Sequence, residues 1–366
     1  MKSVPYGRLL TGAVVAVVLL SAARQAMAQK DKAGEAVKIT TVDGVDLHAM
    51  FYPSPKKDAP TIIMLHKIGE PALNRKAYTG LAASLQPNYS VLVFDFRGQG
   101  KSKDIDPMLF FSEQLNRQQV KGDQKKKQTF ELADIKDKAA YYPAMVNDIA
   151  AVKAWLDRKN DAGACNTSST ILIGAEDGAT LGAIWLATQW NLHRGIPNPA
   201  GIGSMPNNNP EGKDVIACIW LSITPSLGGG KDIKLSKVLG VPVQQNATPT
   251  VFVHGDEDSK GKTLAAALEK DLKGTDNPKK YYYVQKYEVA GKTNLKGINL
   301  LGIKGAEKDV MDYLETVVEK KGNESTRRDF KKMPYFWRQG GQFVPAKNPQ
   351  NDSNLNFNDY HSYLAR

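Results

Sequence analysis

Short runs of apolar residues alternate along the chain with longer segments whose apolar positions recur every three or four residues. The short runs that are apolar on both faces, as buried parallel strands are, cover residues 61–65, 90–94, 170–173 and 215–221. The longer segments predict amphipathic helices at 74–85, 144–159, 179–190, 262–272 and 307–320. The pattern predicts an α/β protein with helices on both faces of a mostly parallel, twisted sheet.

Three segments depart from this alternation. An antiparallel hairpin around Asp43-Gly44 is expected to open the sheet. Two polar insertions, at about 103–140 and 191–214, follow strands or strand–helix segments, where we expect lids and substrate loops. The main domain then covers 29–321. The tail, 322–366, is polar but contains aromatic residues, so we expect part of it to pack on the domain: Phe330, Tyr335, Phe336, Trp337 and Phe343.

The first 28 residues have the layout of a secretory signal peptide. Lys2 and Arg8 precede an uncharged, mostly apolar run at 9–23, and Ala26-Met27-Ala28 forms a small-x-small cleavage site. The alternative is an uncleaved membrane anchor, for which the run is short. We therefore expect export to the periplasm or the exterior, with no stable membrane insertion after cleavage.

Composition narrows the classes of function. The 366 residues are 42% hydrophobic and 24% charged, with a net charge of +11, which excludes a mostly disordered chain. Glycine shows no three-residue period, and only one long apolar run occurs, which excludes a collagen-like or multi-span membrane protein. The lysine runs stand beside acidic residues without a nucleic-acid motif. We expect no nucleic-acid partner, and the expected partner is an unidentified small molecule or protein.

The two cysteines, Cys165 and Cys218, cannot make a disulfide framework or a zinc site. Both are expected toward the N-terminal edge of neighbouring strands, where they could pair, although we favour a buried, unpaired Cys218. Acidic residues gather after two strands, at 176–177 and 256–258, without the spacing of a calcium motif. We expect solvated or lysine-paired carboxylates there, with no metal and no cofactor.

Chemistry is expected just after the strands, because ligands of open α/β sheets bind at the carboxyl ends. The stretches that follow four of the strands are Leu65–Gly69 (LHKIG), Arg97–Ser102 (RGQGKS), Gly174–Gly178 (GAEDG) and His254–Asp258 (HGDED). Taken in this order, they resemble the oxyanion loop, R-G-x-G-x-S turn, G-x-S-x-G nucleophile elbow and acid turn of the α/β-hydrolase family. The resemblance covers about 37–320 and implies the α/β-hydrolase fold.

The departures from the family pattern concern the catalytic residues. Glu176 stands where the elbow serine is expected, and the stretch 289–297, where the base is expected, has no histidine. Only the acid position remains, as Asp258 with Asp256 as the alternative, and the resemblance implies oxyanion donors around Lys67, Ile68 and Asp177. Since a serine hydrolase needs hydroxyl, base and donors together, we expect a pseudoenzyme that acts as a binding or interaction module.

The alternative is an active hydrolase of ester-type small substrates with another nucleophile or base. Asp177 is central in a second frame, as in relatives that use an elbow aspartate, but that mechanism also needs a histidine. His361 could be delivered by the tail, although a surface histidine is the simpler expectation. His66 and His254 each end a strand, where we expect packed structural residues.

Glu176 is expected at the start of a helix, where backbone N–H groups favour negative charge. We predict that its carboxylate fills the oxyanion site from within, either by accepting from those N–H groups or by pairing with Lys67. The alternative is an outward Glu176 that leaves the donors open to a ligand.

Overall fold

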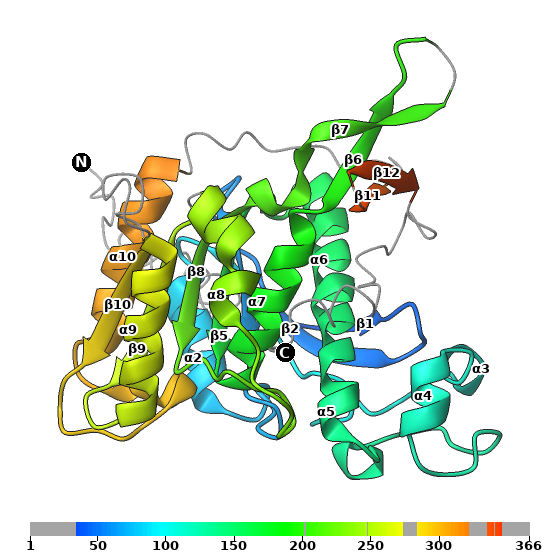
Figure 1. Ribbon diagram of the computed structural model, residues 1–366, viewed down its shortest axis with the longest axis horizontal. Helices are drawn as coiled ribbons and strands as arrows, with labels where there is room; N and C mark the ends of the chain where they lie inside the picture. The colour runs from blue at the N-terminus through cyan, green and yellow to red at the C-terminus, as the bar shows by residue number, and fades with distance from the viewer. Residues whose placement is uncertain are drawn as a thin grey trace, which may run out of the picture.

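The computed structural model describes residues 34–200, 203–246, 248–273, 284–321, 335–339 and 341–345. Eight strands form one sheet in the order β1-β2-β4-β3-β5-β8-β9-β10 (Figure 1). They are β1 (Glu35–Thr40), β2 (Asp46–Tyr52), β3 (Pro60–Leu65), β4 (Ser90–Phe94), β5 (Asn166–Ala175), β8 (Val215–Leu221), β9 (Thr250–Gly255) and β10 (Val284–Val289). The predicted signal peptide and His361 lie outside the described residues.

The four strands predicted from two-sided apolar runs are neighbours in the middle of the sheet. β4, β3, β5 and β8 are parallel, and β9 and β10 continue in the same direction. β1 and β2 form the predicted antiparallel hairpin, and Gly44 in its turn has a φ of 77°, which glycine adopts without strain. The predicted fold class is therefore confirmed.

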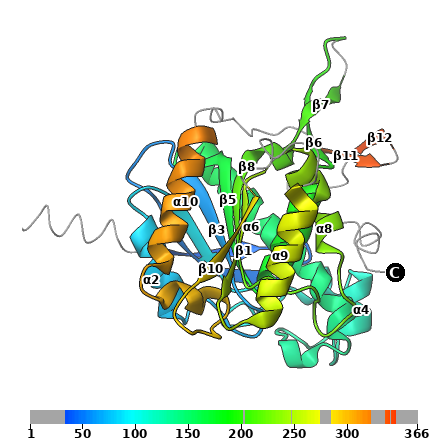
Figure 2. The ribbon, with the colours of Figure 1, turned by 60° about the vertical axis from the view of Figure 1, so that its left-hand side comes forward.

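Helices cover both faces of the sheet. α2 (Lys76–Leu85) and α10 (Ala306–Lys321) pack on one face, and α6 (Val146–Asp161), α7 (Asp177–Gln189), α8 (Leu235–Val238) and α9 (Ser259–Lys273) pack on the other (Figure 2). Along β5, Ile171 and Ile173 point to the face covered by α2 and α10, and Leu172 points to the face covered by α6, α7, α8 and α9. Successive side chains of a strand alternate between the two faces of its sheet in this way. The described residues also form short helices: α3 (Pro107–Phe110), α4 (Gln114–Gln119), α5 (Lys138–Tyr141), 3-10 turns at Leu132–Asp134, Tyr142–Met145, Glu211–Asp214 and Gly297–Gly302, and a π-helical turn at Gly240–Gln245.

The R-G-x-G-x-S stretch after β4 is a tight turn built on buried charge. Arg97 is 1% exposed and lies 2.7 Å from Asp148 Oδ1 and 2.6 Å from Asp43 Oδ2. Ser102 Oγ donates to the carbonyl oxygen of Asp95 at 2.7 Å, which closes the turn. The arginine therefore ties the hairpin turn, strand β4 and helix α6 together. Truncating one partner would leave an uncompensated buried charge.

The insertion at 103–140 follows β4, so it leaves from the carboxyl edge of the sheet. The second insertion, 191–214, follows helix α7. α7 starts at the carboxyl end of β5 and runs back, so the insertion that follows it lies at the opposite edge, where β8 begins.

The second insertion builds a separate sheet. β6 (Leu192–Pro197) and β7 (Ser204–Pro210) form a hairpin, and β11 (Tyr335–Gln339) and β12 (Gln342–Pro345) extend it in the order β12-β11-β6-β7 (Figure 1). The Phe343 ring lies 4.8 Å from the His193 ring, centroid to centroid. The described part of the tail therefore packs on the second insertion, as its aromatic residues predicted.

Both cysteines are buried, and no disulfide joins them. Cys218 lies in the middle of β8 rather than near its start, between Leu172 of β5 and Thr250 of β9. Burial raises the pKa of its thiol well above the usual range, so the sulfur stays protonated.

Candidate functional site

The turn between β5 and α7 has the backbone of a nucleophile elbow. Glu176 has φ 50° and ψ −119°, a region that residues with a Cβ rarely enter. Its N–H donates to the Leu221 carbonyl oxygen at 2.9 Å. A Cβ added at Gly174 would lie 2.6 Å from Ala179 Cα, and one at Gly178 would lie 2.1 Å from the His66 carbonyl oxygen. The two glycines are therefore required for helix and strand to approach this closely.

The Glu176 side chain pairs with Lys67. Lys67 Nζ lies 3.2 Å from Glu176 Oε2 and 3.2 Å from Glu70 Oε1, and Glu70 also pairs with Arg75. Among the described residues, no backbone N–H donates to the Glu176 carboxylate. Of the two predicted arrangements, the ion pair with Lys67 is therefore the one present, and the Glu176 side chain is 15% exposed.

The neighbouring Asp177 takes the position that we predicted for Glu176. Its Oδ1 accepts a hydrogen bond from the Ile68 N–H at 2.7 Å. Burial raises the pKa of the Asp177 carboxyl to about 6, and the negative charge of Glu176 adds to this, while the N–H of Ile68 opposes it. Ile68 is one of the oxyanion donors that the family resemblance implies, so this donor is already occupied by the chain's own carboxylate.

The two candidates for the acid position have different surroundings. Asp256 accepts from three successive N–H groups of the loop after β10, and these bonds hold the pKa of its carboxyl below the usual value. Asp258 is buried and accepts from the Gly261 N–H at 3.1 Å, and its Oδ1 lies 3.3 Å from Lys296 Nζ. Asp256 therefore ties two loops together, and the geometry favours Asp258 for the acid position.

Lys296 stands where the family's base is expected. It lies in the loop after β10, its ammonium contacts the acid-position carboxylate, and the next residue, Gly297, backs onto the elbow. A Cβ added at Gly297 would lie 3.2 Å from Glu176 Oε1. Ser222, after β8, accepts from the Gly297 N–H at 3.2 Å and has a positive φ of 54°. Sequence reasoning missed Lys296 and Ser222; the available signal was the position of Lys296 in the loop after β10, within the stretch where the base is expected.

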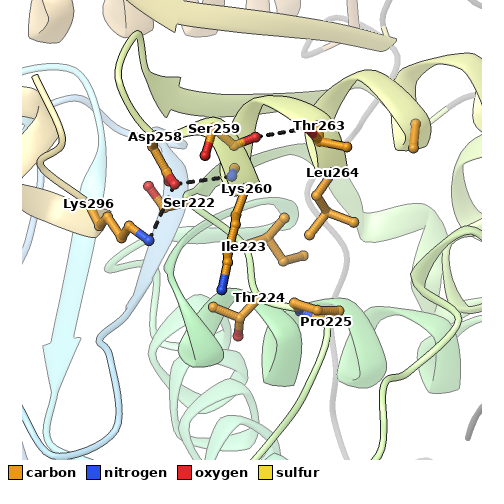
Figure 3. Close-up of a pocket in the computed structure, with 12 residues that line it drawn as sticks. Ser222, Ile223, Thr224, Pro225, Asp258, Ser259, Lys260, Thr263, Leu264 and Lys296 are labelled. Carbon is orange, nitrogen blue, oxygen red and sulfur yellow. Dashed lines mark hydrogen bonds and ion pairs between the residues drawn. The ribbon is translucent and has the colours of Figure 1, made fainter. Parts of the chain in front are cut away.

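A pocket of about 570 Å³ opens beside Asp258 and Lys296 (Figure 3). One wall is the loop after β8, Ser222–Pro225, and the other is the first two turns of α9, from Ser259 to Ala267. Glu176 does not line it. The structure thus brings the acid position and Lys296 to this pocket, and Glu176, Lys67 and Asp177 to the elbow next to it.

Comparisons with known proteins bear on the fold. The DcsB protein, solved with its substrate analogue, superimposes with a TM-score of 0.51 at 13% identity, covering 78% of this chain and 99% of that one. The esterase Pf2001 of Pyrococcus furiosus superimposes with a TM-score of 0.49 at 14% identity, covering 78% of this chain and 91% of that one. The dienelactone hydrolase of Anabaena variabilis superimposes with a TM-score of 0.46 at 12% identity, covering 78% of this chain and 97% of that one. No protein-family model matches the sequence, and no curated protein does.

The chain has the α/β-hydrolase fold. At these identities the likeness concerns the fold alone, so activity has to be argued from the site.

Three of the described histidines, His66, His193 and His254, form hydrogen bonds between a ring nitrogen and a backbone group. His66 is fully buried; its Nε2 accepts from the Phe96 N–H at 2.9 Å, so Nδ1 carries the proton and donates to the Lys67 carbonyl oxygen. Burial lowers the pKa of His66 to about 4. His254 is buried with Nδ1 3.0 Å from the Gly255 carbonyl oxygen, and His193 belongs to the second sheet. The expectation that His66 and His254 are structural is confirmed.

Neither a metal cluster nor a membrane-spanning helix is found in the described part of this α/β-hydrolase fold. No group of three His, Cys, Asp or Glu side chains there could hold a metal ion. Within those same residues, every helix is too short or too polar to cross a bilayer.

Proposed function

We propose that this chain is an exported, non-hydrolytic α/β-hydrolase-fold protein that binds a small molecule. One observation carries the proposal: the elbow presents a carboxylate, Glu176, that is neutralised by Lys67 instead of a hydroxyl activated by a base. Asp177 accepts a hydrogen bond from the Ile68 N–H, and Lys296 forms an ion pair with Asp258, the carboxylate that a catalytic histidine would contact. Hydroxyl, base and one oxyanion donor are thus replaced together, which supports loss of ester hydrolysis.

Stepwise reconstruction tests the loss of catalysis. We expect no labelling by a fluorophosphonate and no turnover of p-nitrophenyl esters by the wild type or by Glu176→Ser, because the base is absent. The double variant Glu176→Ser/Lys296→His supplies hydroxyl and imidazole beside Asp258, and adding Asp177→Gly frees the Ile68 N–H. Activity that first emerges in the triple variant supports the proposal. Turnover by Glu176→Ser alone would reveal a hidden base and overturn it.

Ser222 is the one specific reason to keep an ester hydrolase as the second candidate. Its hydroxyl lines the pocket together with Asp258 and Lys296. The hydroxyl accepts a hydrogen bond from Gly297, which orients it without removing its proton. Fluorophosphonate labelling of the wild type that disappears in Ser222→Ala, and persists in Glu176→Gln, would establish this candidate instead.

Export is the other part of the proposal, and it rests on the leader sequence alone. Cleavage after Ala28 predicts a mature protein that begins at Gln29. N-terminal sequencing of the protein recovered outside the cytoplasm checks this. An intact Met1 on the exported protein would support the uncleaved anchor.

A further inference from the structure

The pocket beside α9 is separate from the elbow and has its own chemistry. Its lining residues come from the loop after β8, from Asp258 and helix α9 after β9, and from Lys296 in the loop after β10, at the carboxyl edge of the sheet. A volume of about 570 Å³ lies within the range of pockets that hold small organic molecules. The volume alone allows a ligand of several carbon atoms, so the lining decides its class.

Apolar side chains face one another across the pocket. Ile223 and Pro225 stand on the loop after β8, and Leu264 stands on the facing side of α9 (Figure 3). Ala267 of α9 also lines the pocket. These four side chains form the apolar part of the pocket lining. This part of the pocket favours a hydrocarbon chain or ring, because burying apolar surface releases water from both sides.

The mouth of the pocket carries a surplus of positive charge. Two ammonium groups, Lys260 and Lys296, line it together with one carboxylate, Asp258. Asp258 is already neutralised by Lys296 and accepts the Gly261 N–H. Lys260 makes no ion pair with any described residue, and its side chain extends across the pocket toward Thr224 (Figure 3). A ligand with one negative charge next to an apolar body would complement this arrangement.

We propose that the pocket binds a small aliphatic carboxylate, with the chain between Ile223 and Leu264 and the carboxylate on Lys260. This inference rests on the proposed function, because it names the class of small molecule that the non-hydrolytic protein binds. Lys296 assists by cancelling the charge of Asp258, which would otherwise repel the ligand. The ammonium of Lys260 supplies donors for the carboxylate oxygens.

A series of head groups on one chain length tests the charge requirement. Isothermal titration of the full mature protein with octanoate, octanol and octylammonium keeps the apolar part constant. We expect octanoate to bind at least tenfold more tightly than either of the others, and its affinity to fall with added salt. Equal affinity for octanoate and octanol would overturn the assignment of a carboxylate ligand.

Variants on α9 test the place of binding. Lys260→Gln should weaken the binding of octanoate at least fivefold and leave the affinity for octanol unchanged. Lys270 lies on the same helix but outside the pocket lining, so Lys270→Gln should change neither affinity. Ala267→Phe fills the pocket at an exposed position and should abolish binding of octanoate while the melting temperature stays within a few degrees. Unchanged octanoate affinity in Lys260→Gln or Ala267→Phe would overturn the site.

The same preparation separates this inference from the proposed function. Turnover of p-nitrophenyl octanoate by the wild type would overturn the non-hydrolytic assignment, whatever octanoate does. Absence of both turnover and octanoate binding would overturn the carboxylate pocket and leave the non-hydrolytic assignment in place.

Discussion

Glu176 keeps the backbone of a nucleophile elbow without a nucleophilic hydroxyl to present. A φ of 50° with a ψ of −119° costs a residue with a Cβ about 1–3 kcal/mol. β5 and α7 hold the residue there from both sides, since all residues of β5 and those from Gly178 to Gln189 are buried. The strain therefore belongs to the turn, and the carboxylate does not cause it.

Two substitutions of Glu176 separate the strain from the ion pair. Glu176→Ala and Glu176→Gly both lose the pair with Lys67, but only glycine relieves the positive φ. We expect the glycine variant to be more stable than the alanine variant by about 1 kcal/mol in urea unfolding, because relief of strain exceeds the extra backbone entropy of glycine. An alanine variant more stable than the glycine variant would show that the turn is unstrained.

Asp177 should make the protein less stable above its pKa than below it. The pKa of Asp177 is about 6 in the folded protein, against an ordinary value of 3.8, so the folded state binds more protons between these pH values. The loss of stability caused by ionisation of Asp177 is absent below pH 3.8 and complete above about pH 6. Asp177→Asn keeps the acceptor for the Ile68 N–H and should add about 2 kcal/mol of stability at pH 7.5 and little at pH 4.

Asp256→Asn is the control of opposite sign. The N–H groups of the loop after β10 lower the pKa of Asp256, so its carboxylate contributes stability above the unfolded pKa and loses it on acidification. Urea unfolding should show this variant less stable than wild type at pH 7.5, with the difference shrinking as the pH falls toward 3. A gain for Asp256→Asn, or a loss for Asp177→Asn, at pH 7.5 would contradict the assignments.

At the residue scale, the sequence predicted which residues lie at the elbow but only part of the contacts that they make. Order along the chain was enough to place Glu176 at the elbow and Lys67 beside it. It did not show that Asp177 rather than Glu176 reaches the Ile68 N–H, because side-chain direction depends on how α7 docks against the loop after β3. Lys296 escaped notice because a lysine after a strand has no signature of its own.

At the scale of single elements, two glycine-to-alanine changes should act in opposite directions. A Cβ at Gly178 would lie 2.1 Å from the His66 carbonyl oxygen, so α7 and the loop after β3 must separate. Gly80 is an exposed helical glycine of α2 whose added Cβ meets only Lys76 Cγ at 3.8 Å. We expect Gly178→Ala to cost about 3 kcal/mol and Gly80→Ala to add roughly 0.5–1 kcal/mol, measured by urea unfolding. A tolerated Gly178→Ala would mean that the elbow is not tightly packed.

The elements that the sequence predicted are those whose burial fixes their composition. Central strands such as 90–94 are buried on both faces, so almost every position must be apolar. β7 has the sequence Ser204–Pro210, rich in asparagine and proline, and most of its residues face solvent. Such residues are depleted in strands, so the hairpin was read as a loop, and only its pairing with β6 makes it a strand.

At the scale of the whole molecule, the described part of the tail supports the second sheet and not the first. β11 pairs with both β6 and β12, and the hairpin of β6 and β7 completes that sheet. Ending the chain at Lys321 should therefore expose the hairpin while the eight-stranded sheet unfolds at nearly its original temperature. Limited trypsin digestion should then cut after Arg194, which is buried in the full chain. An unchanged digest, or loss of cooperative unfolding, would contradict this division.

The buried thiols allow the rate at which the structure opens to be measured. Cys165 is 2% exposed and Cys218 is not exposed at all, so a thiol reagent in solution meets neither sulfur until the structure opens. With the reagent in large excess and reaction faster than reclosing, the rate of labelling equals the rate of opening. Because Cys218 lies in the middle of β8, we expect its labelling to report the opening of the central sheet. Cys165 lies just before β5, so its labelling should report opening at the N-terminal end of that strand. Mass spectrometry of the labelled protein over time would separate the two rates, and faster labelling of Cys218 than of Cys165 would place the weakest point of the fold at its centre.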